Sequence, residues 1–120
     1  CNNKVVGVKA GNMNFYVAMK DLGQGNHNGA SNACSNYVFC NALKGTLPSK
    51  SQLLTMYNNK TALNNSLTSN GGKALANDTY WSSTYSYSSY YIAVSLSSGD
   101  SKELDRVYNY ASYRPVLTSW

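Results

Sequence analysis

The sequence predicts an α+β fold built from two helices and small antiparallel sheets. Short stretches near the start alternate between apolar and polar residues, as strands do. Two later segments, residues 30–43 and a segment that begins near Lys50, have the pattern of helices. From Thr79 onward the sequence indicates only short strands and loops. Helices that lie between the first strands and a late run of strands are typical of α+β proteins.

Two short strands are predicted at Lys4–Val8 and Asn14–Met19. In the second strand, the apolar residues at alternate positions from Phe15 to Met19 share one face, and we expect that face to be buried. The next segment, Gly23–Gly29, is rich in Gly and Asn and is predicted to form a loop.

The first helix is predicted over Ala30–Leu43. The start of the second helix is marked by Pro48, which cannot continue a helix from upstream, and by Ser49 with Gln52 three positions later, which form a capping box. The Asn-Gly-Gly run at residues 70–72 then breaks the chain. The inward face of the second helix is predicted to carry Leu53, Leu54 and Tyr57.

The late strands are predicted from short alternating patterns. Apolar residues at positions 92, 94 and 96 alternate with Tyr, Ala and Ser, which predicts a half-buried strand over Tyr91–Leu96. Ser98–Asp100 is predicted to form a turn. Tyr113–Leu117 is predicted to be a closing strand, and Pro115 indicates that it lies at an edge or contains a bulge.

The chain has 120 residues, which fits a single domain over residues 1–120. Its formal net charge is +5, but residues 1–77 hold seven lysines against one acid, while residues 78–120 hold three basic side chains against four acids. The aromatic residues crowd into the part without excess positive charge, so nucleic acid is not an expected partner. No apolar run approaches the ~18 residues of a membrane helix, so direct membrane insertion is not expected either.

The chain begins at Cys1, and we expect an upstream segment that anchors the domain at a cell or virion surface. In a continuous helix, Cys34 and Cys40 would be separated by roughly 9 Å along the axis, beyond the ~7 Å that a disulfide allows between Cα atoms. These two cysteines could pair only if the helix breaks between them. A bond from Cys1 to one of them, or a lipid on Cys1, also stays open.

No catalytic or metal-binding constellation is present in the sequence, and we expect neither an enzyme nor a cofactor. The single histidine, His27, lies in the predicted Gly/Asn loop and is interpreted as an ordinary loop residue. The serines form no nucleophile elbow. Asp100, Glu103 and Asp105 lack the ligand spacing of a known calcium loop, so a solvated turn is favoured.

The most informative composition lies between Tyr85 and Tyr113, which holds seven of the eleven tyrosines and eight serines. A protein core would use aliphatic residues there. Tyr with Ser is instead typical of antibody-type binding loops, because Tyr gives a large amphipathic contact at low rotamer cost and Ser gives adaptable hydrogen bonds. We expect Tyr113 and Tyr91 to cap the core and the remaining tyrosines to form a recognition surface.

Three motifs follow one another along the chain: Leu47–Lys50 with the helix that it opens, Tyr80–Thr84, and Tyr113–Val116. Together they resemble a bacterial and phage C-type-lectin-like domain family. The resemblance implies a C-type-lectin-like fold in which the first and last strands meet and the late strands and loops build the ligand face. The segment of about residues 80–117 is similar to the variable region of proteins diversified by retroelements, in which adenine-directed mutagenesis varies surface positions on a fixed scaffold.

Carried over position by position, the resemblance implies a scaffold of Trp81, Gly99, Arg114 and Pro115. The calcium-coordinating triplets of sugar-binding lectins are absent, so calcium-dependent sugar binding is not expected. Tyr85 stands where many relatives have an acid, and Thr46 stands where many have an aromatic residue. The displayed, variable set that the resemblance implies is Tyr85, Tyr87, Ser89, Tyr90, Ser95, Glu103, Asp105, Arg106, Tyr108, Asn109 and Tyr110.

The sequence therefore predicts a non-enzymatic receptor or adhesin domain that is displayed outside the cell or on a virion and binds a protein or glycan on another surface. Two alternatives stay open. One is a fixed lectin-like adhesin for a sulfated polysaccharide, favoured by the basic character of residues 1–77. The other is a displayed subunit of a pilus or phage fibre. The sequence does not indicate the oligomeric state.

Overall fold

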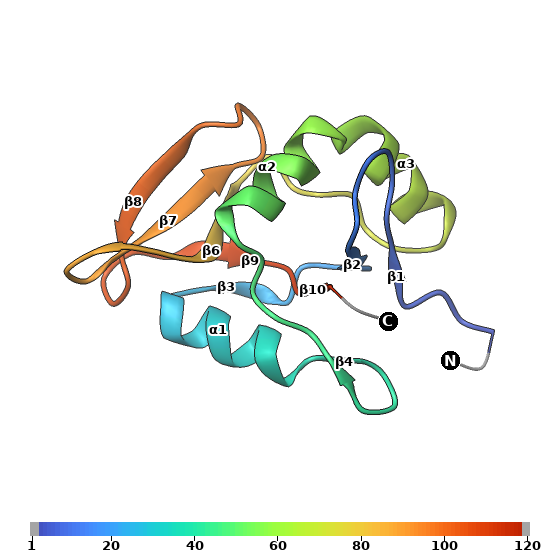
Figure 1. Ribbon diagram of the computed structural model, residues 1–120, viewed down its shortest axis with the longest axis horizontal. Coiled ribbons are helices and arrows are strands. Elements are labelled where there is room, and N and C mark those ends of the chain that lie inside the picture. The colour runs from blue at the N-terminus through green and yellow to red at the C-terminus, as the bar shows by residue number, and fades with distance from the viewer. Residues whose placement is uncertain (1–2, 119–120) are drawn as a thin grey trace.

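A computed structural model describes residues 3–118 and shows a mixed α+β fold (Figure 1). The predicted fold class is therefore confirmed, although the described residues contain three helices rather than two. The elements in chain order are β1 (Gly7–Val8), β2 (Tyr16–Ala18), β3 (Gly23–Gly25), α1 (His27–Asn36), β4 (Val38–Cys40), β5 (Leu43–Lys44), α2 (Lys50–Asn58), α3 (Lys60–Ser69), β6 (Thr79–Tyr87), β7 (Tyr90–Ser95), β8 (Ser101–Asp105), β9 (Ala111–Tyr113) and β10 (Val116–Leu117).

The strands form a five-stranded sheet in the order β3-β9-β6-β7-β8, a three-stranded sheet in the order β1-β2-β10, and the β4–β5 pair. Neighbouring strands are antiparallel except β6 and β9, which run parallel where Tyr80 lies opposite Ser112. The last strand, β10, pairs with β2, which also pairs with the first strand, β1. The first and last strands therefore share one sheet, as the C-type-lectin-like resemblance implies.

The central strands of the five-stranded sheet are covered on both faces. On one face, Tyr80 and Val94 join a large core that includes leucines of α2 and α3. On the other face, Trp81 and Ala93 pack with Ala30 of α1. Figure 1 shows α2 and α3 on one side of the sheet and α1 on the other. The predicted half-buried strand is consequently wrong in one respect, because Ala93 on its second face is fully buried.

Helix α2 begins at Lys50, as predicted. The Ser49 side chain accepts a hydrogen bond from the Gln52 backbone N–H at 3.1 Å, and the Gln52 side chain accepts one from the Ser49 backbone N–H at 2.9 Å. This reciprocal pair satisfies two backbone donors that the first turn of the helix leaves free. Leu53 and Met56 of this helix are fully buried. Leu54 and Tyr57 are partly buried against the same core, which confirms the predicted inward face.

Helix α1 and the segments around it differ from the prediction. The helix starts at His27 because the Asn26 side chain accepts a hydrogen bond from the Gly29 N–H, and it ends at Asn36 because Tyr37 has extended backbone angles. The residues expected to complete the helix instead form the β4–β5 pair. Residues 23–25, expected in a loop, pair with β9 as strand β3. The third helix, α3, was not predicted.

The predicted closing strand is in fact two strands that belong to different sheets. Strand β9 lies in the five-stranded sheet, and β10 lies in the three-stranded sheet. Arg114 and Pro115 carry the chain from one sheet to the other, and both residues are buried. Pro115 has no N–H to contribute to a ladder, so a change of sheet at this position leaves no backbone donor unpaired there.

The two cysteines among residues 3–118 differ: one is a free thiol and the other forms a disulfide. Cys34 is free and fully buried in α1, and its burial raises the pKa of the thiol to about 12. Cys40, at the end of β4, is disulfide-bonded. A bond between Cys34 and Cys40 is therefore excluded, although α1 ends between them. The predictions for Cys1 lie outside the described residues.

The scaffold positions that the resemblance implies are structural. Trp81 is fully buried and donates its indole N–H to the Gly25 carbonyl at 2.8 Å. Gly99 has a φ of +81°, and a Cβ there would lie 2.7 Å from the Tyr57 ring. Any larger residue would be strained in the backbone and would collide with that ring. The scaffold role of these residues is confirmed.

We predict that Trp81→Ala lowers the free energy of unfolding by about 3–5 kcal/mol, because it removes a buried aromatic ring and leaves a cavity. Urea unfolding followed by circular dichroism measures the change. The control is Tyr110→Ala, whose side chain is 72% exposed and whose loss should cost less than about 0.5 kcal/mol. Equal unfolding midpoints for the two variants would contradict the core position of Trp81.

Candidate ligand-binding surface

Three parts of the chain that are distant in sequence meet at one end of the five-stranded sheet (Figure 1). They are the β6–β7 turn at Ser88 and Ser89, the loop of residues 106–110 between β8 and β9, and the start of α1. The Arg106 backbone N–H donates to the Ser89 carbonyl at 2.8 Å, and the His27 N–H donates to the Arg106 carbonyl at 3.0 Å. The backbone of Arg106 therefore ties the turn, the loop and the helix together.

Four tyrosines with exposed side chains lie on or beside these segments. Tyr85 and Tyr87, at the end of β6, are 55% and 58% exposed. Tyr108 and Tyr110, in the loop, are 84% and 72% exposed. We call these four residues the tyrosine surface. Large exposed aromatic side chains gathered at one site mark an interaction surface more often than an accident of composition.

One of the exposed rings, that of Tyr85, is connected to the core by a chain of aromatic contacts. The ring of Tyr85 meets Tyr91 edge-on at 5.4 Å between centroids, and its hydroxyl donates to the Ser88 carbonyl at 2.8 Å. Tyr91 is stacked on His27 at 3.7 Å, and His27 meets the buried Trp81 edge-on at 5.1 Å. Tyr85 is therefore held in one orientation although more than half of it is exposed.

Asp105 folds the loop that carries Tyr108 and Tyr110. Its Oδ1 accepts hydrogen bonds from the backbone N–H groups of Val107 and Tyr108 at 2.8 and 3.1 Å. Its Oδ2 accepts one from the Ser89 hydroxyl at 2.9 Å. These hydrogen bonds favour the charged carboxylate and lower the pKa of Asp105. The loop is consequently ordered by a side chain that was predicted to be displayed.

Other members of the predicted set also hold the surface together rather than project from it. The Asn109 side chain accepts a hydrogen bond from the Asp105 backbone N–H at 2.7 Å. Ser89 contributes its hydroxyl to Asp105, as described above. Tyr90 is partly buried, and its ring lies 5.2 Å from the ring of Tyr87. The side chains of Arg106 and Glu103 are exposed beside them.

Ser95 is the one predicted site residue that the structure places elsewhere. It lies opposite Thr79 at the other end of β7, whereas Tyr90 lies at the tyrosine surface. Its hydroxyl bonds to that of Ser97 at 2.9 Å and helps to shape the β7–β8 turn. The sequence places Ser95 in the Tyr/Ser-rich stretch, but the length of the strand separates it from the other predicted residues.

His27 belongs to this region and was not predicted to do so. The side chain is only 5% exposed, so its interpretation as an ordinary loop residue is wrong. Its Nε2–H donates to the Ser82 carbonyl at 2.8 Å. Burial lowers the pKa of His27, and the charge of Arg106 lowers it further. The sequence carries one signal that could have located it, namely Asn26 as the N-cap of a helix that starts at His27.

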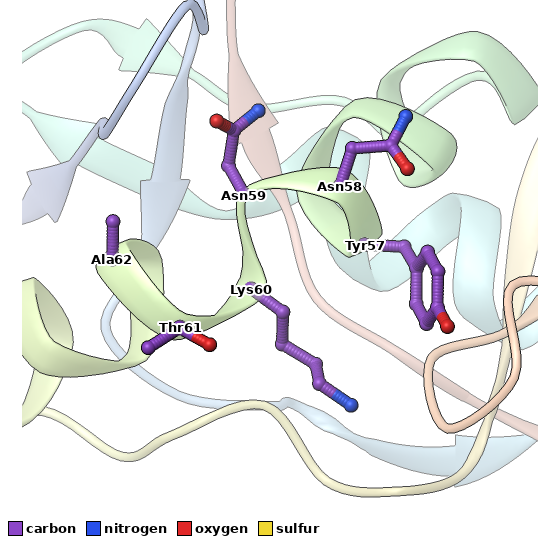
Figure 2. A pocket seen from close by; sticks show the side chains of 6 residues that line it. All are labelled: Tyr57, Asn58, Asn59, Lys60, Thr61 and Ala62. Carbon is purple, nitrogen blue, oxygen red and sulfur yellow. The ribbon is translucent and has the colours of Figure 1, made fainter.

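A separate pocket of about 480 Å³ lies at the junction of α2 and α3 (Figure 2). Figure 2 shows Lys60 extending toward the same side of the junction as the ring of Tyr57. The Lys60 ammonium donates to the Leu96 carbonyl at 2.8 Å and lies 5.5 Å from the centre of that ring. These contacts hold the junction against the β7–β8 turn. None of the predicted site residues lines this pocket, which is formed by Tyr57, Asn58, Asn59, Lys60, Thr61 and Ala62.

Within residues 3–118, no group of three His, Cys, Asp or Glu side chains could hold a metal ion. No helix in the same range combines the length and the apolar character that crossing a bilayer requires.

Comparison with known proteins shows a similarity to a solved structure but to no sequence family. No protein-family model matches the sequence, and no curated protein sequence matches it. Among solved structures, the Yersinia pseudotuberculosis adhesin InvE is similar over 96% of this chain, with a TM-score of 0.60 and 18% sequence identity. The match covers 34% of the InvE chain, so the present chain spans about a third of that adhesin's length.

This similarity establishes a shared fold. At 18% identity it does not carry the binding properties of InvE to this chain. The α+β arrangement with its first and last strands in one sheet is therefore a fold that a bacterial adhesin also uses. Diversification of the segment of residues 80–117 by a retroelement stays a prediction.

We predict that Asp105→Ala disorders the loop without unfolding the domain, because it removes the acceptor for the Val107 and Tyr108 amides. Hydrogen exchange at these two amides should accelerate, while the urea midpoint changes little. Asp100→Ala is a matched control, since Asp100 is also exposed but lies in the β7–β8 turn. Unchanged exchange at Val107 and Tyr108 would show that Asp105 does not order the loop.

Proposed function

We propose that this chain is a surface-displayed binding domain without catalytic activity, and that its ligand face is the tyrosine surface together with Arg106. The observation that carries the proposal is that four exposed tyrosines lie at the end of β6 and on the loop after β8, two segments that a backbone hydrogen bond from Arg106 to Ser89 ties together. An exposed Tyr can contact a partner with its ring and donate a hydrogen bond with its hydroxyl. Tyr and Arg are also the residue types enriched among the residues that dominate binding energy.

Because these segments are conformationally ordered before a ligand binds, tight binding is favoured. A flexible loop loses conformational freedom when it binds, and that loss subtracts from the affinity. Here Asp105 holds the loop of residues 106–110, and Tyr91 supports Tyr85. The surface is therefore largely in place before a ligand arrives, and most of the contact energy remains available for affinity.

Two observations support display outside the cell. The fold is shared with a bacterial adhesin, and Cys40 is disulfide-bonded, as is typical of proteins in oxidising compartments. The absence of catalysis is supported by the buried position of His27, whose Nε2 already donates to a backbone carbonyl. The proposed ligand is a protein or a glycan on another surface.

We further propose that the tyrosine surface is diversified by a retroelement. Tyr85, Tyr87, Tyr108 and Tyr110 are exposed, so other side chains could replace them without entering the core. Their codons could therefore vary while the scaffold persists. Sequencing this gene across many cells of the source population tests the proposal. Substitutions confined to about residues 85–112, with an adenine-rich near-copy nearby, support it, whereas an invariant segment without a near-copy indicates a fixed adhesin.

We predict that the double variant Tyr108→Ala, Tyr110→Ala weakens binding at least about tenfold and leaves stability unchanged, because both rings are exposed. Beads that carry the domain are tested for adhesion to arrayed glycans and to a panel of cell types.

The matched control for this adhesion test removes two exposed apolar side chains outside the tyrosine surface, Val5→Ser and Val38→Ser, which are 42% and 45% exposed. Adhesion should survive in the control and be lost in the tyrosine variant. Adhesion that survives in the tyrosine variant and is lost in the control would contradict the proposed ligand face.

A fixed adhesin for a sulfated polysaccharide is the second candidate. It is favoured by the excess of lysines in residues 1–77. Five of these lysines have exposed side chains: Lys4, Lys9, Lys20, Lys44 and Lys73. Binding to immobilised heparin that falls steeply with added salt would support it, since exposed charges are screened by salt. Salt-insensitive binding would exclude it. A displayed position in a pilus or phage fibre is compatible with either ligand.

A further inference from the structure

His27 connects the parts of the chain that build the tyrosine surface. Its ring nitrogen donates to the Ser82 carbonyl of β6 at 2.8 Å, and its backbone N–H donates to the Arg106 carbonyl at 3.0 Å. Its ring is stacked on Tyr91 of β7, with the centroids 3.7 Å apart and the planes 18° apart. One residue at the start of α1 thus contacts two strands and the loop of residues 106–110.

These contacts help to fix the orientation of the tyrosine surface. The plane of Tyr91 is set on one side by the stacked His27 ring, and Tyr91 in turn presents its ring to the edge of Tyr85. The Arg106 peptide, which His27 holds through its carbonyl, begins the loop that carries Tyr108 and Tyr110. Displacement of His27, with both its ring and its backbone N–H, would therefore reach both halves of the tyrosine surface.

The surroundings of His27 disfavour its charged form. From β6 the ring meets Trp81 and Ser82, which carry no charge, and from β7 it meets the neutral phenol of Tyr91. Burial is the largest effect and lowers the pKa of His27. The hydrogen bond to the Ser82 carbonyl favours the charged ring but does not outweigh burial, and the positive charge of Arg106 acts in the same direction as burial. The nearby carboxylate of Asp105 is already bound to backbone amides and to a hydroxyl in the loop.

We propose that His27 is a positioning residue that makes the tyrosine surface responsive to pH. With His27 neutral, α1 is closed against the sheet and the tyrosine surface is ordered. When His27 takes up a proton, the start of α1 separates from β6 and β7, and Tyr85 and the loop of residues 106–110 lose their fixed orientation. The consequence for ligand binding rests on the proposed function, whereas the conformational change does not.

The direction of the pH dependence follows from the lowered pKa of His27. An opened or unfolded state binds the proton at the ordinary pKa of 6.5, before the closed state does. The closed state is therefore fully stable above pH 6.5 and loses stability as the pH falls from there toward the lowered pKa. In that window the opening equilibrium grows by about tenfold per pH unit.

The test is an NMR titration of the full chain from about pH 7.5 to about pH 5. In this window His27 is the side chain expected to titrate. The ring signals of Tyr85 and Tyr91 should shift together with those of His27. Protection of the Arg106 amide from hydrogen exchange, corrected for the intrinsic rate, should fall about tenfold per pH unit. Titration of His27 without a change at Tyr85 and Arg106 would overturn the proposal.

Two variants remove the titrating group in different ways. His27→Phe keeps a ring to stack on Tyr91, and His27→Gln keeps a donor for the Ser82 carbonyl. Both should abolish the transition at Tyr85 that the original chain shows. A transition that persists in either folded variant would overturn the proposal, and the titration of the unchanged domain decides the matter if neither variant folds.

Failure of the proposed role of His27 can be distinguished from failure of the proposed ligand-binding function. The NMR transition requires no ligand, so it can be present even if the Tyr108→Ala, Tyr110→Ala variant still adheres. Conversely, adhesion that depends on the tyrosines but is equal at both ends of the pH range would leave the ligand face in place and overturn the role of His27.

Discussion

The structure depends on one ion pair, made by a buried arginine with a partly exposed aspartate, at the point where the two sheets join. Arg114 is 1% exposed, and its Nε donates to the Asp21 carboxylate at 2.7 Å. Its Nη atoms donate to the carbonyls of Lys73 and Ala74 at 2.8 and 3.2 Å. The Tyr80 hydroxyl donates to the same carboxylate. A buried guanidinium is tolerated only when its donors are satisfied, so this network requires the chain on both sides of the junction to be in place.

This junction explains how the proposed ligand face can be rigid. Because Tyr80 belongs to β6 and Arg114 follows β9, the network holds two adjacent strands of the five-stranded sheet. The same sheet continues through β7 into β8, and the proposed surface lies at the end of β6 and on the loop that follows β8. Recognition by side chains on turns requires that the turns do not move, and here the turns extend from a sheet whose central strands are packed on both faces. The residues proposed to bind a ligand and the residues that stabilise the sheet are thus different.

The elements that the sequence predicts well are those whose signals are local. Helix α2 starts where Ser49 and Gln52 place it, because a capping box needs only four consecutive residues. Helix α1 was misplaced because its N-cap, Asn26, lies in a Gly/Asn run that also favours loops. Its end at Asn36 is imposed by the extended backbone of Tyr37 and by the pairing of β4 with β5, which local propensity does not report.

The candidate site shows the same division. The sequence by itself determined that the late segment is rich in Tyr and Ser and has no excess positive charge, and this composition predicts a recognition surface. Only the tertiary structure decided which of these side chains are displayed, as Tyr108 is, and which fold the loop, as Asp105 does. It also brought in His27 and excluded Ser95. The physical reason is that a hydrogen bond or a ring contact depends on distances between residues far apart in the chain, and sheet pairing sets those distances.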